Sequence, residues 1–248
     1  MARLPSGARQ DIFETVDSTS LEAKRRADAG EEGPRWFIAL KQTAGYGRQG
    51  RAWSQATGDF SGTLLFKPGC ATDQLGQISF IAALSVASAL DEVIAPEKIT
   101  FKWPNDVLID GAKAAGILLE HLGPADISKD GAPLLAVGIG VNIVSAPADV
   151  PYPTARLVDH ADNAPSPQDL AARIDHHFWA YLKDWETNGF ANIRRLWLTR
   201  ARGIGAEIRV RLPNEELSGV FEGLDESGAL ILQSGAEKRI ISAGDVYF

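Results

Sequence analysis

Two short segments of this chain carry residue types that bind and activate anionic substrates. The first is glycine-rich and contains two arginines, Arg48 and Arg51, within Gly45-Tyr46-Gly47-Arg48-Gln49-Gly50-Arg51. Arginine pairs with carboxylate and phosphate through two parallel hydrogen bonds and stays charged at any working pH. Glycine lets the backbone close over a ligand. Trp53 follows, and its indole can stack on a ring of the ligand or act as a hydrophobic lid. An ordinary solvated loop has a similar composition, so the loop alone leaves both interpretations open.

The glycines of that segment match the G-x-G-x-x-G pattern of dinucleotide-binding folds, but we reject this interpretation. The pattern requires a helix that begins at its last glycine, Gly50 here, so that the helix N-terminus meets the pyrophosphate. The residues after Gly50, Arg-Ala-Trp-Ser-Gln-Ala-Thr-Gly, have no helical periodicity, and the chain does not continue as βαβ units.

The second segment is Lys102-Trp103-Pro104-Asn105-Asp106, which precedes a predicted β-hairpin. Asp110-Gly111 between two apolar runs predicts a type I′ turn. A two-residue loop would pair Asp106 with Ala115 and make Asp106 and Lys113 diagonal neighbours, roughly 7–8 Å apart at Cβ. A carboxylate suits Mg²⁺, and a lysine suits developing charge on phosphate or carbonyl oxygen. If Asp106 and Lys113 stood alone, they would be interpreted as a surface salt bridge. The polar residues just before the hairpin favour a ligand-binding site instead.

The other chemical signals are weaker. Glycines inside a strand, as in Gly138-Ile139-Gly140-Val141-Asn142, usually mark a close approach of backbone or ligand, although relief of crowding against a helix is the alternative. Asn142 suits a phosphate contact or a turn cap. The four histidines show no metal-ligand spacing, and Cys70 has no evident catalytic partner.

The elements that position these segments are predicted from apolar periodicity and turn residues. Thr19 and Glu22 have capping-box spacing at the start of a helix that Gly30 ends. The predicted strands are 11–16, 36–42, 62–66, the hairpin and 134–143, and the predicted helices are 19–29, 75–94, 167–186 and 189–202. Short strands at 206–212, 217–224, 229–233 and 238–242 then indicate a small β-barrel. We therefore predict two domains, 1–202 and 203–248.

Composition limits the class of protein. A hydrophobic content of 45% and a charged content of 23% are typical of a globular chain. One cysteine excludes an intramolecular disulfide, and a net charge of −7 argues against nucleic acid bound over most of the surface. The sequence shows neither a signal peptide nor an apolar run of about 20 residues. We expect a soluble cytoplasmic protein without a membrane or DNA partner.

Taken together, these segments resemble the biotin–protein ligases over essentially the whole chain. The Lys-Trp-Pro-Asn-Asp string followed by Lys-x-x-Gly-Ile is very specific, and the matches at 17–19, 42–53, 102–106, 113–120 and 138–143 have the family's order and spacing. The resemblance implies an α+β fold. It comprises a catalytic domain similar to class II aminoacyl-tRNA synthetases, with a mixed, mostly antiparallel sheet, and a C-terminal SH3-like barrel.

The reaction that this resemblance implies has two steps. Biotin and MgATP would give biotinyl-5′-AMP and pyrophosphate, and a lysine of a biotin carboxyl carrier domain, typically that of acetyl-CoA carboxylase, would then take the biotin. The implied catalytic residues are Lys113, Arg48 and Asp106, with Asp106 also at the Mg²⁺. The implied biotin and ATP ligands are Ser18, Thr19, Ser20, Gln42, Gly45, Tyr46, Gly47, Arg48, Arg51, Trp53, Lys102, Asn105, Lys113, Gly116 and Asn142.

Two residues depart from the family pattern. Tyr46 stands where arginine is common, and Ser20 stands where asparagine is common. Some members carry an N-terminal DNA-binding domain, but Ser18-Thr19 comes so early that we expect none here and no repressor function. Monomer and homodimer both stay open. The alternative functions are a lipoate or octanoate–protein ligase of the same fold and a non-catalytic biotin-binding module.

Overall fold

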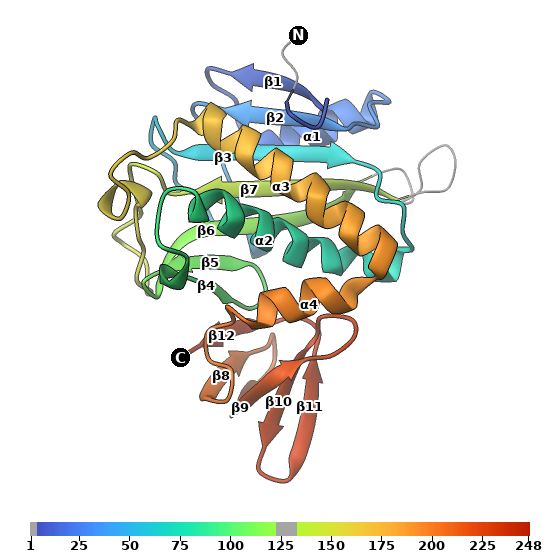
Figure 1. Ribbon diagram of the computed structural model, residues 1–248, viewed down its shortest axis with the longest axis vertical. Coiled ribbons are helices and arrows are strands. Elements are labelled where there is room, and N and C mark those ends of the chain that lie inside the picture. The colour runs from blue at the N-terminus through green and yellow to red at the C-terminus, as the bar shows by residue number, and fades with distance from the viewer. Residues whose placement is uncertain (1–3, 123–132) are drawn as a thin grey trace.

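The computed structural model describes residues 4–122 and 133–248, which form a seven-stranded sheet with helices on both faces and a smaller five-stranded sheet (Figure 1). Only β1 and β2 of the large sheet are parallel, and its other neighbouring strands are antiparallel. The mixed, mostly antiparallel sheet that the family resemblance implies is therefore confirmed. In spatial order its strands are β1 (Arg9–Phe13), β2 (Arg35–Ala39), β3 (Phe60–Phe66), β7 (Leu134–Val141), β6 (Ala112–Leu122), β5 (Asp106–Ile109) and β4 (Ile99–Lys102).

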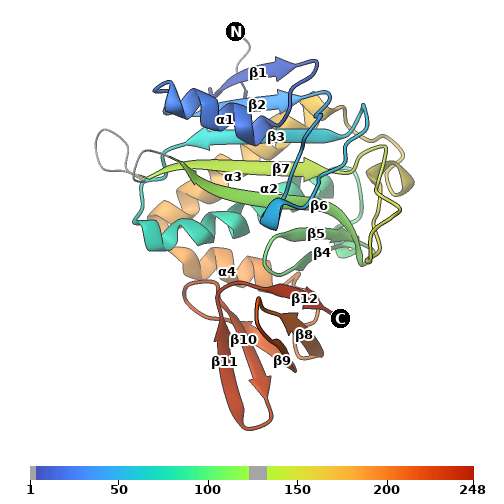
Figure 2. The same ribbon diagram turned by 180° about the vertical axis from the view of Figure 1, so that it is seen from behind.

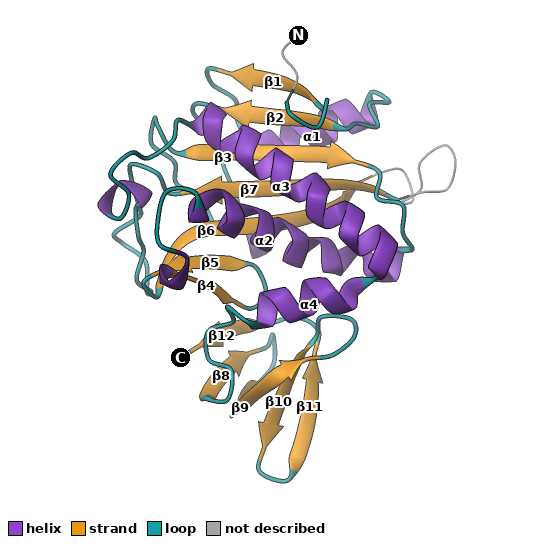
Figure 3. Cartoon of the chain, viewed as in Figure 1, coloured by secondary structure: helices purple, strands orange, loops and turns teal. Residues whose placement is uncertain are grey.

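The helices divide the large sheet into two unlike faces. Helices α2 (Ile78–Asp91) and α3 (Pro167–Asn188) cover one face (Figures 1 and 3). The α2 helix is buried almost all round, which explains its apolar sequence. Helix α1 (Thr19–Asp28) lies on the opposite face, where the loop between β2 and β3 crosses the remaining strands (Figure 2). That second face therefore has room for a ligand. In the described part of the chain, no helix is long and apolar enough to cross a membrane.

The start of α1 differs from the expected capping box. Ser18 is the N-cap residue and makes no side-chain cap hydrogen bond, while Thr19 is the first helical residue. The Thr19 hydroxyl donates to Gln42 Oε1 at 3.2 Å, and Glu22 pairs with arginines on the next turn of the helix. A tertiary contact thus uses the Thr19 side chain, and ion pairs within the helix use that of Glu22, the two side chains that the capping box requires.

The predicted hairpin is present, with one change of register. Asp110 and Gly111 have φ values of 48° and 81°, as a type I′ turn requires. The register shifts between Val107 and Leu108, so Asp106 pairs with Gly116 rather than with Ala115 as expected. With this register Ala115 points into the core, on the opposite face from Asp106, and Leu118 lines a cavity on the same face as Asp106.

The C-terminal residues form the small antiparallel β-domain that the sequence predicts. Helix α4 (Phe190–Leu198) leads into its strands, β8 (Glu207–Arg211), β9 (Glu216–Leu224), β10 (Leu230–Ser234), β11 (Glu237–Ile241) and β12 (Asp245–Tyr247), in the spatial order β11-β10-β9-β8-β12. The sequence analysis missed β12, because three residues are too few for a periodic signal. Trp103 Nε1 donates to the Gly228 carbonyl at 3.1 Å, and one hydrophobic core continues through both sheets. The two sheets are therefore firmly packed together.

Candidate active site

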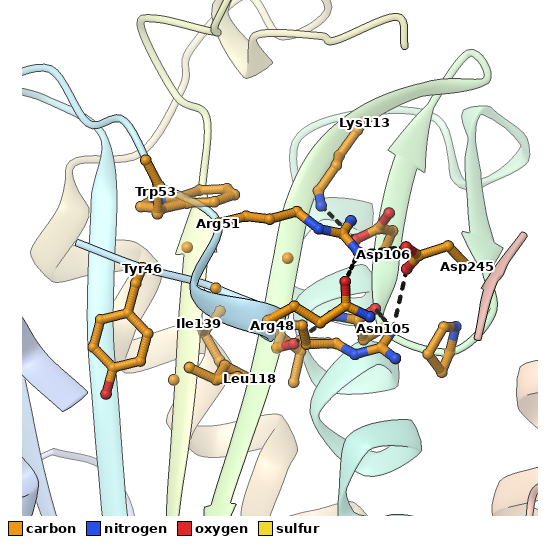
Figure 4. A pocket seen from close by; sticks show the side chains of 18 of the residues that line it. Tyr46, Arg48, Arg51, Trp53, Asn105, Asp106, Lys113, Leu118, Ile139 and Asp245 are labelled. Atoms are coloured by element: carbon orange, nitrogen blue, oxygen red, sulfur yellow. Dashed lines mark hydrogen bonds and ion pairs between the residues drawn. The ribbon is translucent and has the colours of Figure 1, made fainter. Parts of the chain in front are cut away.

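A cavity of about 650 Å³ lies on the α1 face of the large sheet. Its walls come from the loop between β2 and β3, from strands β3, β7, β6 and β5, from the loop after β7, and from β8 and β12 of the small sheet. Segments far apart in the sequence thus meet at one place (Figure 4). The volume is in the range of small-molecule and cofactor sites.

The floor of the cavity is a row of residues that are register partners across the sheet. Ser61, Gly140, Gly116, Asp106 and Lys102 follow one another on β3, β7, β6, β5 and β4. Cross-strand partners point to the same face, so this row presents a hydroxyl at one end and charges at the other.

The two glycines in this row make room for an aromatic side chain. A Cβ built on Gly140 would lie 2.3 Å from the Trp53 ring, and one on Gly116 would lie 3.3 Å from it. The indole therefore lies directly against the strand backbone. The close neighbour of Gly140 is thus the Trp53 side chain of the loop, and not the backbone, ligand or helix that the sequence analysis considered.

Asp106 gathers two ammonium groups at the charged end of the row. Its carboxylate lies 2.6 Å from Lys113 Nζ and 3.5 Å from Lys102 Nζ. Both ammonium groups lie near the Tyr152 ring, at 5.8 Å from its centroid for Lys102 and 5.7 Å for Lys113. Asp106 is only 8% exposed, so little water screens this cluster. Two cations share one carboxylate, which leaves net positive charge for an anionic ligand.

The arginines of the loop lie beside this cluster (Figure 4). Arg48 Nη1 donates to Asn105 Oδ1 at 3.1 Å and, from both terminal nitrogens, to the Gly244 carbonyl at 3.4 Å. Arg51 pairs with Asp245 of β12. Burial lowers the pKa of the Arg48 guanidinium from its ordinary value, which still leaves it charged at neutral pH. The small sheet therefore contributes an acidic partner to both arginines of the loop.

The backbone of Lys113 is held on both sides. Its N–H donates to the Pro153 carbonyl at 2.8 Å, and its carbonyl accepts from Ala155 N at 2.9 Å. Asn142 Nδ2 donates at 3.3 Å to the same Lys113 carbonyl and to that of Ala155. The buried Asn142 side chain does not line the cavity, so it supports Lys113 instead of the expected phosphate contact or turn cap.

The other end of the cavity is polar but uncharged. Gln42 Oε1 accepts from the backbone N–H of Thr19 at 2.8 Å, and the Thr19 hydroxyl accepts from Thr63 Oγ1 at 2.8 Å. Ser20 Oγ lies 3.3 Å from Thr63 Oγ1. These hydroxyl and amide groups form a wall suited to a neutral ligand group with hydrogen-bonding atoms.

Tyr46 connects the loop to strand β6. Its hydroxyl donates to the Glu120 carboxylate at 2.9 and 3.1 Å. Burial and the neighbouring Glu120 raise the pKa of Tyr46, so the phenol stays a donor at neutral pH. Tyr46 therefore anchors the loop over the uncharged end of the cavity, beside Leu118 (Figure 4).

The cavity brings together the residues that the sequence analysis selected, except Gly45 and Asn142. Gly45 lies against Gln42, where a Cβ would be 2.7 Å from Nε2. Sequence reasoning missed Ser61 of β3 and the lining residues from the loop after β7 and from the small sheet. The only local signal among them is an aromatic residue between two prolines, Tyr152. The missed residues of the loop and the small sheet are Val150, Pro151, Tyr152, Arg211, Asp245, Val246 and Tyr247.

The donor set fits a magnesium ion that arrives with a nucleotide. Within the described ranges, no group of three or more His, Cys, Asp or Glu side chains has the arrangement of a metal site. Asp106 supplies a carboxylate beside the cationic groups, and Asp245 lies close to the same arginines. Mg²⁺ is usually held by one or two carboxylates together with substrate phosphates and water.

Comparison with known proteins decides the family. Residues 12–142 match the model of the biotin/lipoate A/B protein ligase family, and residues 203–248 match that of the biotin protein ligase C terminal domain. The chain is 40% identical over 239 residues to the biotin–[acetyl-CoA-carboxylase] ligase of Paracoccus denitrificans, covering 94% of this chain and 98% of that protein. The chain belongs to the biotin protein ligase family.

Other biotin protein ligases are also similar to this chain in sequence and in structure. The chain is 31% identical to the biotin–[acetyl-CoA-carboxylase] ligase of Mycobacterium tuberculosis, covering 97% of this chain and 90% of that one. The solved biotin protein ligase from Aquifex aeolicus in complex with biotin and ATP superposes with a TM-score of 0.79 at 24% identity, over 96% of this chain and 97% of that one. The α+β fold that the resemblance implies is thus confirmed.

Proposed function

We propose that this protein is an ATP-dependent biotin–protein ligase. The observation that carries the proposal is a cavity, in a member of the biotin protein ligase family, with cations at one end and a neutral hydrogen-bonding wall at the other. Joining a carboxylate to a triphosphate brings two anions together, so cations must offset their repulsion. The neutral wall suits the uncharged ureido ring of biotin.

In the first step, a carboxylate oxygen of biotin attacks the α-phosphorus of ATP, and the bond to pyrophosphate breaks. The product is biotinyl-5′-AMP. Lys113 places its ammonium between the two reacting anions, because its backbone is held on both sides and Asp106 holds its side chain. Arg48 and Arg51 bind the phosphates and stabilise charge on the leaving group. Catalysis is then mainly positioning and charge stabilisation.

The residues present fit MgATP as the nucleotide substrate. Asp106, with Asn105 beside it, would hold Mg²⁺ together with the phosphates, and the bound ion would neutralise phosphate charge. Trp53 belongs to the nucleotide side, where its indole lies against Gly140 and Gly116. Its position over the strands also helps to keep water from the labile mixed anhydride.

In the second step, the ε-amine of a carrier lysine attacks the acyl carbon of the adenylate. The bond to AMP breaks, an amide forms and the amine releases a proton. The proposed carrier is the biotin carboxyl carrier domain of acetyl-CoA carboxylase or a related enzyme, which places the reaction in the cytoplasm.

We assign biotin binding to the neutral wall formed by Ser18, Thr19, Ser20 and Gln42. We also divide the chain into a catalytic domain, 1–202, and a C-terminal domain, 203–248. The C-terminal domain supplies Arg211, Asp245 and Tyr247 to the cavity, which supports a role in nucleotide binding.

The test is biotin-dependent exchange of labelled pyrophosphate into ATP, run beside lipoate and octanoate. Exchange with biotin alone is expected, because the other two acids lack a hydrogen-bonding ring to satisfy the neutral wall. Exchange with lipoate or octanoate instead of biotin would refute the assignment of biotin as the substrate. No exchange with any acid, in a sample shown to be folded by circular dichroism, would overturn the enzymatic function and favour a binding module.

A further inference from the structure

Asp59 is a buried carboxylate between two of the loops that enclose the cavity. It is the residue just before β3, it is 2% exposed, and it does not line the cavity. The neighbouring strand β7 ends at Val141, which pairs with Phe60. The Asp59 side chain therefore lies where the chain leaves β7 and enters the loop that brings Tyr152 to the cavity.

One oxygen of this carboxylate holds the start of the loop after β7. Its Oδ1 atom accepts from three successive backbone N–H groups, at 2.8 Å from Ile143, 2.8 Å from Val144 and 3.0 Å from Ser145. Successive N–H groups that converge in this way form a site for a negatively charged oxygen. Hydrogen bonds to an ionised group are stronger than those between neutral groups, so the carboxylate fixes the direction in which the chain turns.

This turn determines where the loop returns to Lys113. The Ile143 carbonyl accepts from Val158 N at 3.0 Å, which joins the start of the loop to its end. Just before that end, the Pro153 carbonyl and the Ala155 N–H hold the Lys113 backbone at 2.8 and 2.9 Å. The buried carboxylate is thus connected to Lys113 through backbone hydrogen bonds of the loop.

The second oxygen holds the end of the loop between β2 and β3. Asp59 Oδ2 accepts from Ala56 N at 2.9 Å and from the Ser145 hydroxyl. Gly58 packs against the other loop, because a Cβ built on it would lie 3.0 Å from the Val144 side chain. The loop that carries both cavity arginines is therefore joined to the loop after β7 at one carboxylate.

We propose that Asp59 is a positioning residue for the formation of the adenylate. Its Oδ1 atom fixes the loop that holds the Lys113 backbone, and its Oδ2 atom fixes the loop that brings Arg48 and Arg51 to the phosphates. Asp59 is buried outside the cavity lining, so it acts through these residues and touches neither substrate. This inference rests on the proposed function and adds Asp59 to it. A misplacement of reacting groups by about 1 Å can lower a rate about 100-fold.

Two substitutions of Asp59 separate its two roles. Asp59→Ala removes both oxygens. Asp59→Asn keeps one carbonyl oxygen, which can accept from the three N–H groups at 143–145, but it turns an amide N–H toward the N–H of Ala56. Asp225→Ala is the matched control, because Asp225 also accepts from two backbone N–H groups, in the turn between β9 and β10, and does not line the cavity.

Biotin-dependent pyrophosphate exchange measures both roles. Asp59→Ala is expected to lower kcat about 10- to 100-fold and to raise the KM for ATP, because both loops lose their support. Asp59→Asn is expected to keep kcat within about threefold and to raise the KM for ATP about 2- to 10-fold, as for the loss of one hydrogen bond. Asp225→Ala should lower Tm without changing either constant.

The KM for biotin provides a further comparison within each variant. The neutral wall is held by hydrogen bonds among Thr19, Gln42 and Thr63. Its affinity for biotin should therefore stay within about twofold of wild type in both Asp59 variants, as for sites without shared partners. A merely structural role would instead lower every constant together.

Limited proteolysis tests the two connections without any enzymatic activity. Trypsin cleaves after Arg51 in one loop and after Arg156 in the other, and mass spectrometry identifies each cut. Asp59→Ala should speed both cuts, whereas Asp59→Asn should speed the cut after Arg51 alone. Asp225→Ala should speed neither.

Three kinetic results would overturn the proposal. They are a normal kcat in Asp59→Ala, an equal loss of kcat in Asp59→Asn, and losses in Asp225→Ala that match those of Asp59→Ala. If Asp59→Ala does not fold, unchanged cleavage after Arg51 in Asp59→Asn refutes it. Wild-type exchange is measured first. Its absence refutes the proposed function, whereas normal wild-type exchange with a normal kcat in Asp59→Ala refutes the role of Asp59 alone.

Discussion

Asp245 occupies the arginines that a triphosphate needs, and its removal should therefore tighten ATP binding. Its carboxylate pairs with Arg51 and lies 4.0 Å from Arg48 Nη1. In Asp245→Asn the shape of the side chain is kept and the charge is lost. ATP phosphates then no longer compete with a protein carboxylate for the same guanidinium groups.

The exposure of the pair sets the size of the effect. The Arg51 side chain is 51% exposed and that of Asp245 is 20% exposed, so solvent screens the pair. Ion pairs of this kind contribute about 0.2–1 kcal/mol. If the ATP phosphates no longer compete with the Asp245 carboxylate, the KM for ATP should fall by a factor of about 1.4 to 5.

The assay is biotin-dependent pyrophosphate exchange at several ATP and salt concentrations. The difference from wild type should shrink as salt rises, because screening weakens the pair that the substitution removes. Glu222→Gln is the matched control, since Glu222 forms an exposed pair with Lys238 on the same small sheet and does not line the cavity. A rise in the KM for ATP in Asp245→Asn would refute the reasoning, because it would make Asp245 a group that orients the arginines or holds the metal ion.

Further substitutions test the rest of the site and the scaffold. Lys113→Ala should lower pyrophosphate exchange by a factor of about 100 to 1,000 while circular dichroism stays unchanged, and near-normal exchange would remove Lys113 from the mechanism. Tyr46→Phe loses the hydrogen bond to Glu120, so trypsin should cleave the 45–58 loop faster than in wild type. Biotin plus ATP should slow that cleavage in the wild-type protein, and an unchanged rate would contradict ligand-induced ordering of the loop. Asp175→Ala leaves four donors from Ser6, Trp36 and Trp179 without their acceptor. Urea unfolding should therefore show a free energy of unfolding lower by at least about 3 kcal/mol. A decrease of less than about 1 kcal/mol would contradict this account.

Local sequence determined those parts of the fold that depend on a few neighbouring residues. Asp110-Gly111 accepts the positive φ angles of a type I′ turn, and that turn places Lys113 opposite Leu108. Continuous apolar character predicted α2, because a helix covered on all sides needs no polar face. The Gly-Arg loop and the Lys-Trp-Pro-Asn-Asp string likewise identified Arg48, Arg51, Lys102 and Asp106 of the cavity lining.

Tertiary structure alone decided which of these groups touch. The shift between Val107 and Leu108 changes the partner of Asp106 from Ala115 to Gly116, and a bulge of this kind depends on packing against neighbouring strands. Asp245 reaches Arg51 across nearly 200 positions of sequence. A local pattern carries information over a few residues, whereas these contacts depend on how two sheets pack around one core. The sequence therefore determined which chemical groups the protein has, and the packing of the whole chain decided which of them share the cavity.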